Sequence, residues 1–151
     1  MLYRVETGLH ANITDTQGRK TALHLLKALQ IPVAAIRQIK VYTVDGLDAA
    51  QVNRLVDEGI WHDPILQQAS LEPLPFVEPA PHWIVEVGYR PGVTDNEGRT
   101  ARDTAAMGLG IARDSLRVYT SVQYRITCTP DRMLGREEVE ALARDLLCNT
   151  L

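Results

Sequence analysis

The sequence predicts an α+β fold made of two tandem units that pack as a pseudo-dimer, each in the order β-α-β-α-β. Three observations support this prediction: an internal repeat, a matching order of strand and helix patterns in both halves, and a proline-rich segment between them. We expect the first repeat to span residues 1–71, the linker residues 72–82 and the second repeat residues 83–151.

The internal repeat emerges when residues 3–22 are compared with residues 83–102. At a constant offset of 80, seven of these 20 positions are identical, whereas ordinary amino-acid usage gives about one or two identities by chance. Such self-similarity indicates that one structural unit has been duplicated. The identical pairs are Val5/Val85, Glu6/Glu86, Gly8/Gly88, Thr14/Thr94, Asp15/Asp95, Gly18/Gly98 and Arg19/Arg99.

Each repeat opens with a strand pattern, at residues 3–7 and 83–87, followed by a turn into a helix. Thr14 and Gln17 have the spacing of a capping box, in which a threonine accepts from the helix backbone and a glutamine reaches back. The same spacing recurs 80 residues later, and an aspartate follows each threonine, where the helix dipole favours negative charge. The pattern predicts two helices that begin at equivalent positions.

The rest of the first repeat reads as helix, strand, helix and a short third strand. The first helix ends at Ile31-Pro32, because the residue before a proline is disfavoured in a helix. A strand is expected at residues 35–44 and a second helix from the cap Asp48 to about Ile60. A third strand is expected at residues 65–71.

The linker, residues 72–82, holds four prolines in eleven positions and is expected to be a stiff, extended connector. Beyond it, the patterns predict a helix at residues 96–109, a strand at 115–127 and a helix at 136–148. A third strand equivalent to that of the first repeat is missing before Leu151. We therefore expect the chain to be a fragment of a longer protein.

Composition argues against several functional classes. The net charge is -3 and the pI about 5.8, with acidic and basic residues interspersed, so we expect no nucleic-acid partner. No apolar stretch approaches the roughly 18 residues of a membrane span. Cys128 and Cys148 have no nearby metal-ligating partners in sequence, which favours two reduced thiols and a cytoplasmic location.

The pairs Gly18-Arg19 and Gly98-Arg99 are the sharpest candidates for a site. An anion could bind at the helix N-terminus beside each arginine. Alternatively, the glycines allow close packing against a strand, while the arginines pair with the aspartate three residues before each glycine or with a partner chain. The sequence favours the structural interpretation.

Catalytic motifs such as Walker A, G-x-S-x-G and H-E-x-x-H are absent from the sequence. The four histidines are far apart, which disfavours a metal site. Glu6 and Glu86 lie in mid-strand, on a face open to solvent or between the repeats, and would need a cleft to act as an acid/base pair. We therefore expect no catalytic, cofactor or metal site in this domain.

The segment 85–99 resembles the opening of PurS, the small accessory subunit of phosphoribosylformylglycinamidine (FGAM) synthase. That family has a strand followed by a (K/R)-x-G-V-x-D-x-x-G turn into a helix. Residues 10–18 match the motif more loosely, with Ala11-Asn12 in place of Pro-Gly. The residues that carry the resemblance, and that we expect at turns or interfaces, are Arg90, Pro91, Gly92, Asp15, Gly18, Arg19, Asp95, Gly98 and Arg99.

The resemblance implies an assembly role. Large single-chain forms of this carbon–nitrogen ligase carry an N-terminal domain that looks like a fused PurS dimer with ferredoxin-like character. Such domains contact the synthetase and glutaminase parts, support ammonia transfer and carry no catalytic residues. The parent enzyme of purine biosynthesis is implied to use ATP, Mg and glutamine, and self-association of the domain is also possible.

The alternative hypothesis is a ligand-sensing module. Tandem ferredoxin-like units of the ACT type bind small effectors between their copies. In that case, the two Gly-Arg pairs would hold the anionic group of the ligand. A stand-alone enzyme is the least favoured interpretation, because it would need a cleft with perturbed titratable groups.

Overall fold

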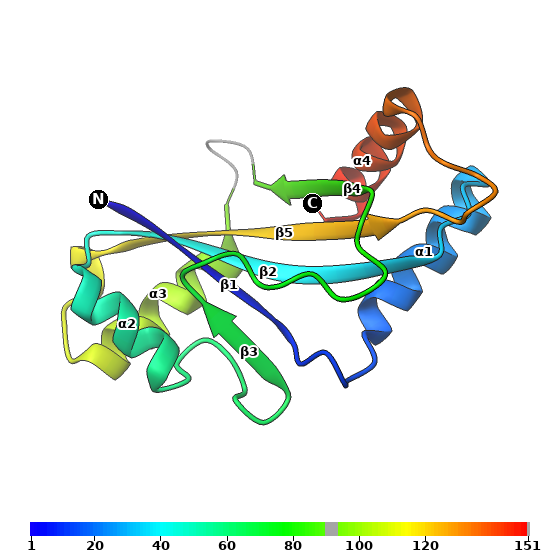
Figure 1. Ribbon diagram of the computed structural model, residues 1–151. Coiled ribbons are helices and arrows are strands. Elements are labelled where there is room, and N and C mark those ends of the chain that lie inside the picture. Colours follow the sequence, from blue (N-terminus) through cyan, green and yellow to red (C-terminus); the bar gives the residue numbers. More distant parts are fainter. Residues whose placement is uncertain (90–93, 151) are drawn as a thin grey trace. The chain divides into compact units, whose positions relative to one another are not determined.

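The computed structural model describes residues 1–89 and 94–150, with side chains as far as Leu146. Within them the fold is mixed α+β, with four α-helices and a five-stranded sheet of strand order β3-β1-β2-β5-β4 (Figure 1). The elements are β1 (Leu2–Leu9), α1 (Thr16–Leu29), β2 (Ala35–Asp45), α2 (Ala49–Asp57), β3 (Gln67–Ser70), β4 (Trp83–Gly88), α3 (Asn96–Leu109), a 3-10 turn (Arg113–Ser115), β5 (Arg117–Thr127) and α4 (Arg136–Thr150).

The helices and strands follow the order that the sequence predicts, with small shifts at their ends. Helix α1 ends at Leu29 because Gln30 adopts a left-handed conformation with φ 54°. Gly110 ends α3 in the same conformation, at φ 69°, as is typical of glycine at this position. Strand β5 begins at Arg117, two residues later than predicted, because the 3-10 turn precedes it.

Strand β1 pairs antiparallel with β2 on one side and with β3 on the other. The register places Thr7 opposite Lys40 of β2 and opposite Ala69 of β3. Because side chains alternate across a strand, this register fixes the positions that face the core. Val5 and Val44, both fully buried, belong to the same apolar cluster.

The chain divides into two compact units, and each takes segments from both sequence repeats. Unit 1 consists of residues 1–13, 40–75 and 89–121, and unit 2 of residues 14–39, 76–88 and 122–151. Unit 1 therefore contains α2 and α3, whereas unit 2 contains α1 and α4. The compact units do not follow the repeat boundaries, because the helices of one repeat are not packed in the same core.

Unit 1 has an aliphatic core between its helices and strands. Leu55 of α2 and Ala105 of α3 are 1% and 0% exposed, and the small alanines of α3 let the two helices approach closely. The buried members of this cluster are Val5, Val44, Leu47, Val52, Leu55, Ala101, Ala105, Ala106, Leu116 and Val118.

Unit 2 has a separate core with larger side chains. Leu25 of α1 and Leu142 of α4 are both fully buried. Each helix of unit 2 therefore contributes a leucine to its core, whereas α3 contributes alanines to the core of unit 1. Cys128 is a buried free thiol in this core, and the Cys148 side chain lies outside the described residues. The buried members are Leu25, Ile31, Ile36, Val87, Tyr124, Ile126, Cys128, Leu134, Val139, Leu142 and Leu146.

The first part of the linker is packed into unit 1 and is not a free spacer. Leu74 is 3% exposed, and its backbone N–H donates to Oε1 of Glu6 at 3.0 Å. Glu6 is itself buried, and its Oε2 accepts from Nε of Arg4 at 3.2 Å. Of the two faces predicted for Glu6, the solvent-exposed one was therefore wrong, because the linker packs against this side of β1.

Candidate functional site

An aspartate is the N-cap residue of each of the two equivalent helices, α1 and α3. Oδ1 of Asp15 accepts from the backbone N–H of Gly18 at 2.8 Å, and its Oδ2 accepts from the backbone N–H of Gln38 at 2.8 Å. Asp95 repeats this arrangement with Gly98 and Thr120, both at 2.7 Å. Each carboxylate therefore caps a helix and ties it to a strand.

The predicted threonine caps were wrong, since the N-cap residues are Asp15 and Asp95. Both residue types favour this position, but a threonine has one oxygen. A carboxylate has two, and can serve the helix and the strand at once. A true capping box occurs at α2, where Asp48 and Gln51 exchange hydrogen bonds.

The glycines of the motif allow the helices to pack against strand backbone. A Cβ added to Gly18 would lie 1.9 Å from the carbonyl oxygen of Ile36, and one added to Gly98 would lie 2.5 Å from that of Val118. No side chain fits at either distance. The prediction that these glycines permit close packing is confirmed.

The arginines of the motif do not pair with the capping aspartates within the described residues. Arg19 and Arg99 are exposed, and their backbone N–H groups donate to the carbonyl oxygens of Asp15 and Asp95 at 3.1 Å. An anion at these helix starts would have to compete with the carboxylates that already accept from the first turn. The remaining motif residues, Arg90, Pro91 and Gly92, lie outside the described residues.

The repeat also relates two pockets, one in each unit. Equivalent residues of α1 and α3 are 80 positions apart, as Gly18 and Gly98 are. The backbone carbonyl groups that these glycines approach belong to Ile36 of β2 and Val118 of β5, so equivalent residues of these two strands are 82 positions apart. With this offset Tyr42 of β2 corresponds to Tyr124 of β5. Tyr42 lines a pocket with α3, and Tyr124 lines a pocket with α1.

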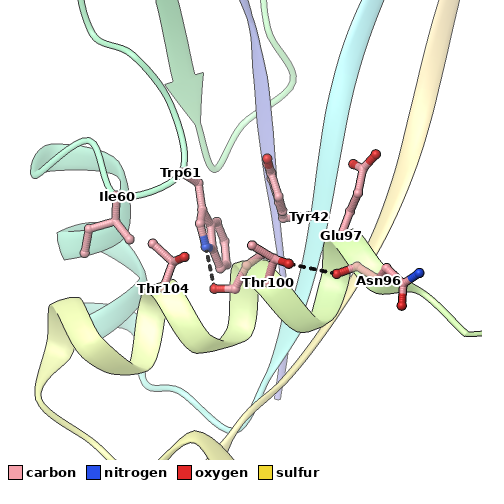
Figure 2. Close-up of a pocket in the computed structure, with 8 residues that line it drawn as sticks. Tyr42, Ile60, Trp61, Asn96, Glu97, Thr100 and Thr104 are labelled. Carbon is pink, nitrogen blue, oxygen red and sulfur yellow. Dashed lines mark hydrogen bonds between the residues drawn. The ribbon is translucent and has the colours of Figure 1, made fainter.

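The unit 1 pocket is aromatic and has a volume of about 390 Å³. Figure 2 shows Trp61, from the segment after α2, beside Tyr42 and above α3. The two rings stack with centroids 4.6 Å apart and an interplanar angle of 18°. Nε1 of Trp61 donates to the carbonyl oxygen of Ala101 at 2.9 Å. The remaining lining residues are Ile60, Asn96, Glu97, Thr100 and Thr104.

The charged side chain that lines the unit 1 pocket, Glu97, already has an ion-pair partner, and one of the two lining threonines has a hydrogen-bond partner. Glu97 forms an ion pair with Lys40, and Oγ1 of Thr100 donates to the carbonyl oxygen of Asn96 at 3.1 Å. Burial lowers the pKa of Lys40, although the charge of Asp95 opposes this. Burial raises the pKa of Tyr42, so its phenol stays neutral at physiological pH. The pocket therefore offers flat apolar surface with few uncommitted polar groups.

The unit 2 pocket is polar and has a volume of about 340 Å³. One face of α1 supplies Gln17, Lys20, Thr21 and His24, at the spacing that places residues on one side of a helix. The other lining residues are Gln38 of β2, Tyr124 of β5 and Leu146 of α4.

Hydrogen bonds fix two parts of the unit 2 pocket. Nε2 of His24 lies 2.7 Å from Oδ2 of Asp145 on α4, which orients the imidazole ring. Oγ1 of Thr21 donates to Oε1 of Gln38 at 2.5 Å, which leaves the Gln38 Nε2 as its donor. Tyr124 is only 6% exposed, yet its hydroxyl has no hydrogen-bond partner among the described residues.

Neither pocket was predicted from the sequence. The aspartates and glycines of the motif serve the helix starts and line neither pocket, whereas Gln17 and Glu97, at variable positions of the motif, each line one. The sequence feature that could have indicated the pockets is the pair Tyr42 and Tyr124, at equivalent positions of two strands. Hydrophobic periodicity identifies these tyrosines only as part of an apolar strand pattern. Among the described residues, no group of three or more His, Cys, Asp or Glu side chains could hold a metal ion.

Comparison with family models, curated proteins and solved structures returned no match. Across the described part of the chain, no helix has both the length and the apolar character needed to cross a membrane.

Proposed function

We propose that this chain is a non-catalytic, PurS-like domain of FGAM synthase, with its two repeats acting as a covalent pseudo-dimer in the cytoplasm. In this role it would assemble the ATP-dependent synthetase and the glutaminase and support ammonia transfer between them. The observation that carries the proposal is the shared role of the motif in both repeats. Asp15 with Gly18, and Asp95 with Gly98, make the same backbone contacts.

These contacts support a scaffold role because the motif residues are engaged in holding helix against strand. Both oxygens of each carboxylate already accept from a backbone N–H group, and the glycines have no side chain to offer a ligand. A fused pair of PurS-like units would contain two equivalent contacts of this kind between a helix and a strand in one chain. Each compact unit also combines segments of both repeats, as expected for two copies that fold together.

Two exposed leucines on α1 support a contact with a protein partner. Leu23 and Leu26 are 51% and 48% exposed and lie three residues apart, so they are neighbours on the helix surface. Exposed leucines at this spacing offer apolar area that a partner would remove from water, at roughly 25 cal/mol per Å². We assign this pair to the contact with the synthetase or glutaminase.

The proposal is tested by co-expressing the chain with a synthetase and a glutaminase of the same source and measuring amidine formation. We expect the three parts to co-purify. We also expect removal of the chain to abolish glutamine-dependent activity and to spare activity with free ammonia. Full glutamine-dependent activity without the chain would overturn the proposal.

A surface variant makes the test specific. The double substitution Leu23→Glu and Leu26→Glu should prevent co-purification, because two charges would be buried at the contact. Lys27→Glu, on the same exposed side of α1, is the matched control and should leave assembly intact. Equal loss with both variants would contradict the assignment of the leucine pair.

The alternative of an ACT-like sensor placed the ligand's anionic group at the Gly-Arg pairs. The N–H groups of Gly18 and Gly98 already donate to carboxylates at 2.8 and 2.7 Å. No observation at these positions therefore favours sensing over assembly. Sensing at another place in the chain remains a separate prediction.

A further inference from the structure

We propose that the unit 2 pocket binds a small organic anion through a carboxylate or phosphate group held by Lys20 and Tyr124. This inference does not depend on the proposed assembly role, because Lys20 and Tyr124 belong neither to the leucine pair nor to the motif of residues 10–18. It rests on three features of the pocket: a hydroxyl on a largely buried tyrosine, an ammonium group outside the ion pairs found, and the lack of carboxylates among the described lining residues.

The hydroxyl of Tyr124 is the first feature. The side chain is 6% exposed and packs in the unit 2 core, where a buried phenol usually finds a hydrogen-bond partner. It has none among the described residues, and its oxygen is not sealed from solvent either. Tyr124 lines the pocket, so we assign its hydroxyl to a ligand there, as a donor held by a rigid ring.

The ammonium group of Lys20 is the second feature. Lys20 lines the same pocket, and none of the ion pairs found among the described residues involves it. An ammonium group is a donor with no acceptor capacity, so it selects an anionic or carbonyl oxygen. Lys20, Tyr124 and Gln38, each of which has a donor group, line the same pocket.

The charge of the lining is the third feature. Nε2 of His24 already lies 2.7 Å from Oδ2 of Asp145 on α4, so this imidazole has a partner outside the lining. Gln17 occupies the position that Glu97 holds in the unit 1 pocket, and none of the described residues that line the unit 2 pocket carries a carboxylate. Lys20 therefore supplies a positive charge with no carboxylate beside it among the described lining residues, as an anion requires.

The size of the pocket limits the ligand. About 340 Å³ is near the lower end of the range for small-molecule sites. Leu146 provides an apolar contact for the carbon part of the ligand. A compound of a few carbons with one acidic end group fits this description.

The test is an NMR titration of the intact chain with inorganic phosphate and, separately, with succinate. We expect at least one probe to give saturable shifts confined to the amides of residues 17–24 and 124. A response to phosphate alone or to succinate alone identifies the preferred end group. The absence of saturable shifts with both probes, or shifts centred elsewhere, would overturn the proposal.

Two variants and one control decide whether the named side chains carry the binding. Tyr124→Phe keeps the ring and should raise the dissociation constant about fivefold. Lys20→Gln, at an exposed position, should raise it about tenfold. Tyr42→Phe is the matched control, because Tyr42 occupies the equivalent position in unit 1, and it should leave the titration unchanged. Wild-type binding by both test variants would exclude the proposed contacts.

Discussion

The two pockets are built on the same framework and differ in the side chains that face the ligand space. Both consist of the first helix of one repeat and a tyrosine from the long strand of the other. At equivalent helix positions the unit 1 pocket has Glu97, Thr100 and Thr104. The unit 2 pocket has Gln17, Lys20 and His24. The helix face that lines the pocket carries the negative charge of Glu97 in unit 1 and the positive charge of Lys20 in unit 2.

This difference separates the positions that build the fold from those that are free to vary. The aspartate and glycine of the helix start are identical in both repeats, because each makes backbone contacts that no other residue reproduces. The residues one turn further along α1 and α3 face a cavity and carry no such constraint. Duplication therefore preserves the framework while the two pockets acquire different chemistry.

The largest effect is expected from filling the space at the helix starts. Gly18→Ala places a methyl group 1.9 Å from a carbonyl oxygen, and Gly98→Ala places one at 2.5 Å. We expect losses of about 3 kcal/mol and about 2 kcal/mol in the free energy of unfolding, measured by urea denaturation. Gly135→Ala, with no atom within 4 Å, is the control and should change stability by less than about 0.5 kcal/mol.

Equal, small losses at Gly18 and Gly98 would show that the helices can shift away from the strands. The predicted difference in stability between the Gly18 and Gly98 variants would then be wrong, since the shorter distance at Gly18 would not lower the free energy of unfolding further.

A smaller effect is expected at the capping aspartates, and it should be unequal. Oδ1 of Asp95 also accepts from Oγ1 of Thr120 at 2.8 Å, and Asp15 has only its two backbone partners among the described residues. We expect Asp95→Ala to cost about 3 kcal/mol and Asp15→Ala about 2 kcal/mol. Thermal and urea denaturation of the purified variants measure both.

The extra hydrogen bond can be isolated with a double-mutant cycle. Thr120→Val should cost about 1 kcal/mol alone, and in its presence the cost of Asp95→Ala should fall to that of Asp15→Ala. Strict additivity of the two changes would contradict a direct contribution from the threonine hydroxyl.

The smallest effect is a pH dependence in unit 1. Burial lowers the pKa of His62 below its ordinary 6.5, Asp63 opposes this, and His10 lowers it further. Nδ1 of His62 is buried without a hydrogen-bond partner. Because the folded-state pKa is depressed, the contribution of His62 is fully present above pH 6.5 and is lost as the pH falls towards the folded-state value.

The measurement is the urea midpoint of wild-type protein and of His62→Asn between pH 7.5 and about 5. The variant should show a weaker decline over this range. A decline as steep as that of the wild-type protein would assign the pH dependence to other groups.

The sequence predicted most of the elements because their signals are local. Gly110 ends α3 through its own backbone freedom, and the prolines of residues 72–82 exclude regular structure. The close packing at Gly18 and Gly98 was also predictable, since the repeat placed a glycine in the first turn of both helices. These features need no knowledge of which elements meet in space.

The remaining features depend on tertiary pairing. A helical apolar pattern shows which face of α1 is buried, but not that its partner is α4. Thr14 and Asp15 are both good caps, and the second carboxylate oxygen that reaches Gln38 decides between them. The two pockets exist only because the faces of α1 and α3 meet tyrosines from the opposite repeat.

The interleaving of the two units also determines when each core can form. The chain passes between the units five times, and unit 1 requires residues up to 121 while unit 2 includes residues up to 151. On a ribosome, the first repeat would emerge with α1 and α2 both lacking the helix with which each forms a core. Contacts between segments far apart in sequence slow folding. We therefore expect the unit 1 core to form only after residues up to 121 have been synthesised, and the unit 2 core only after α4 has followed.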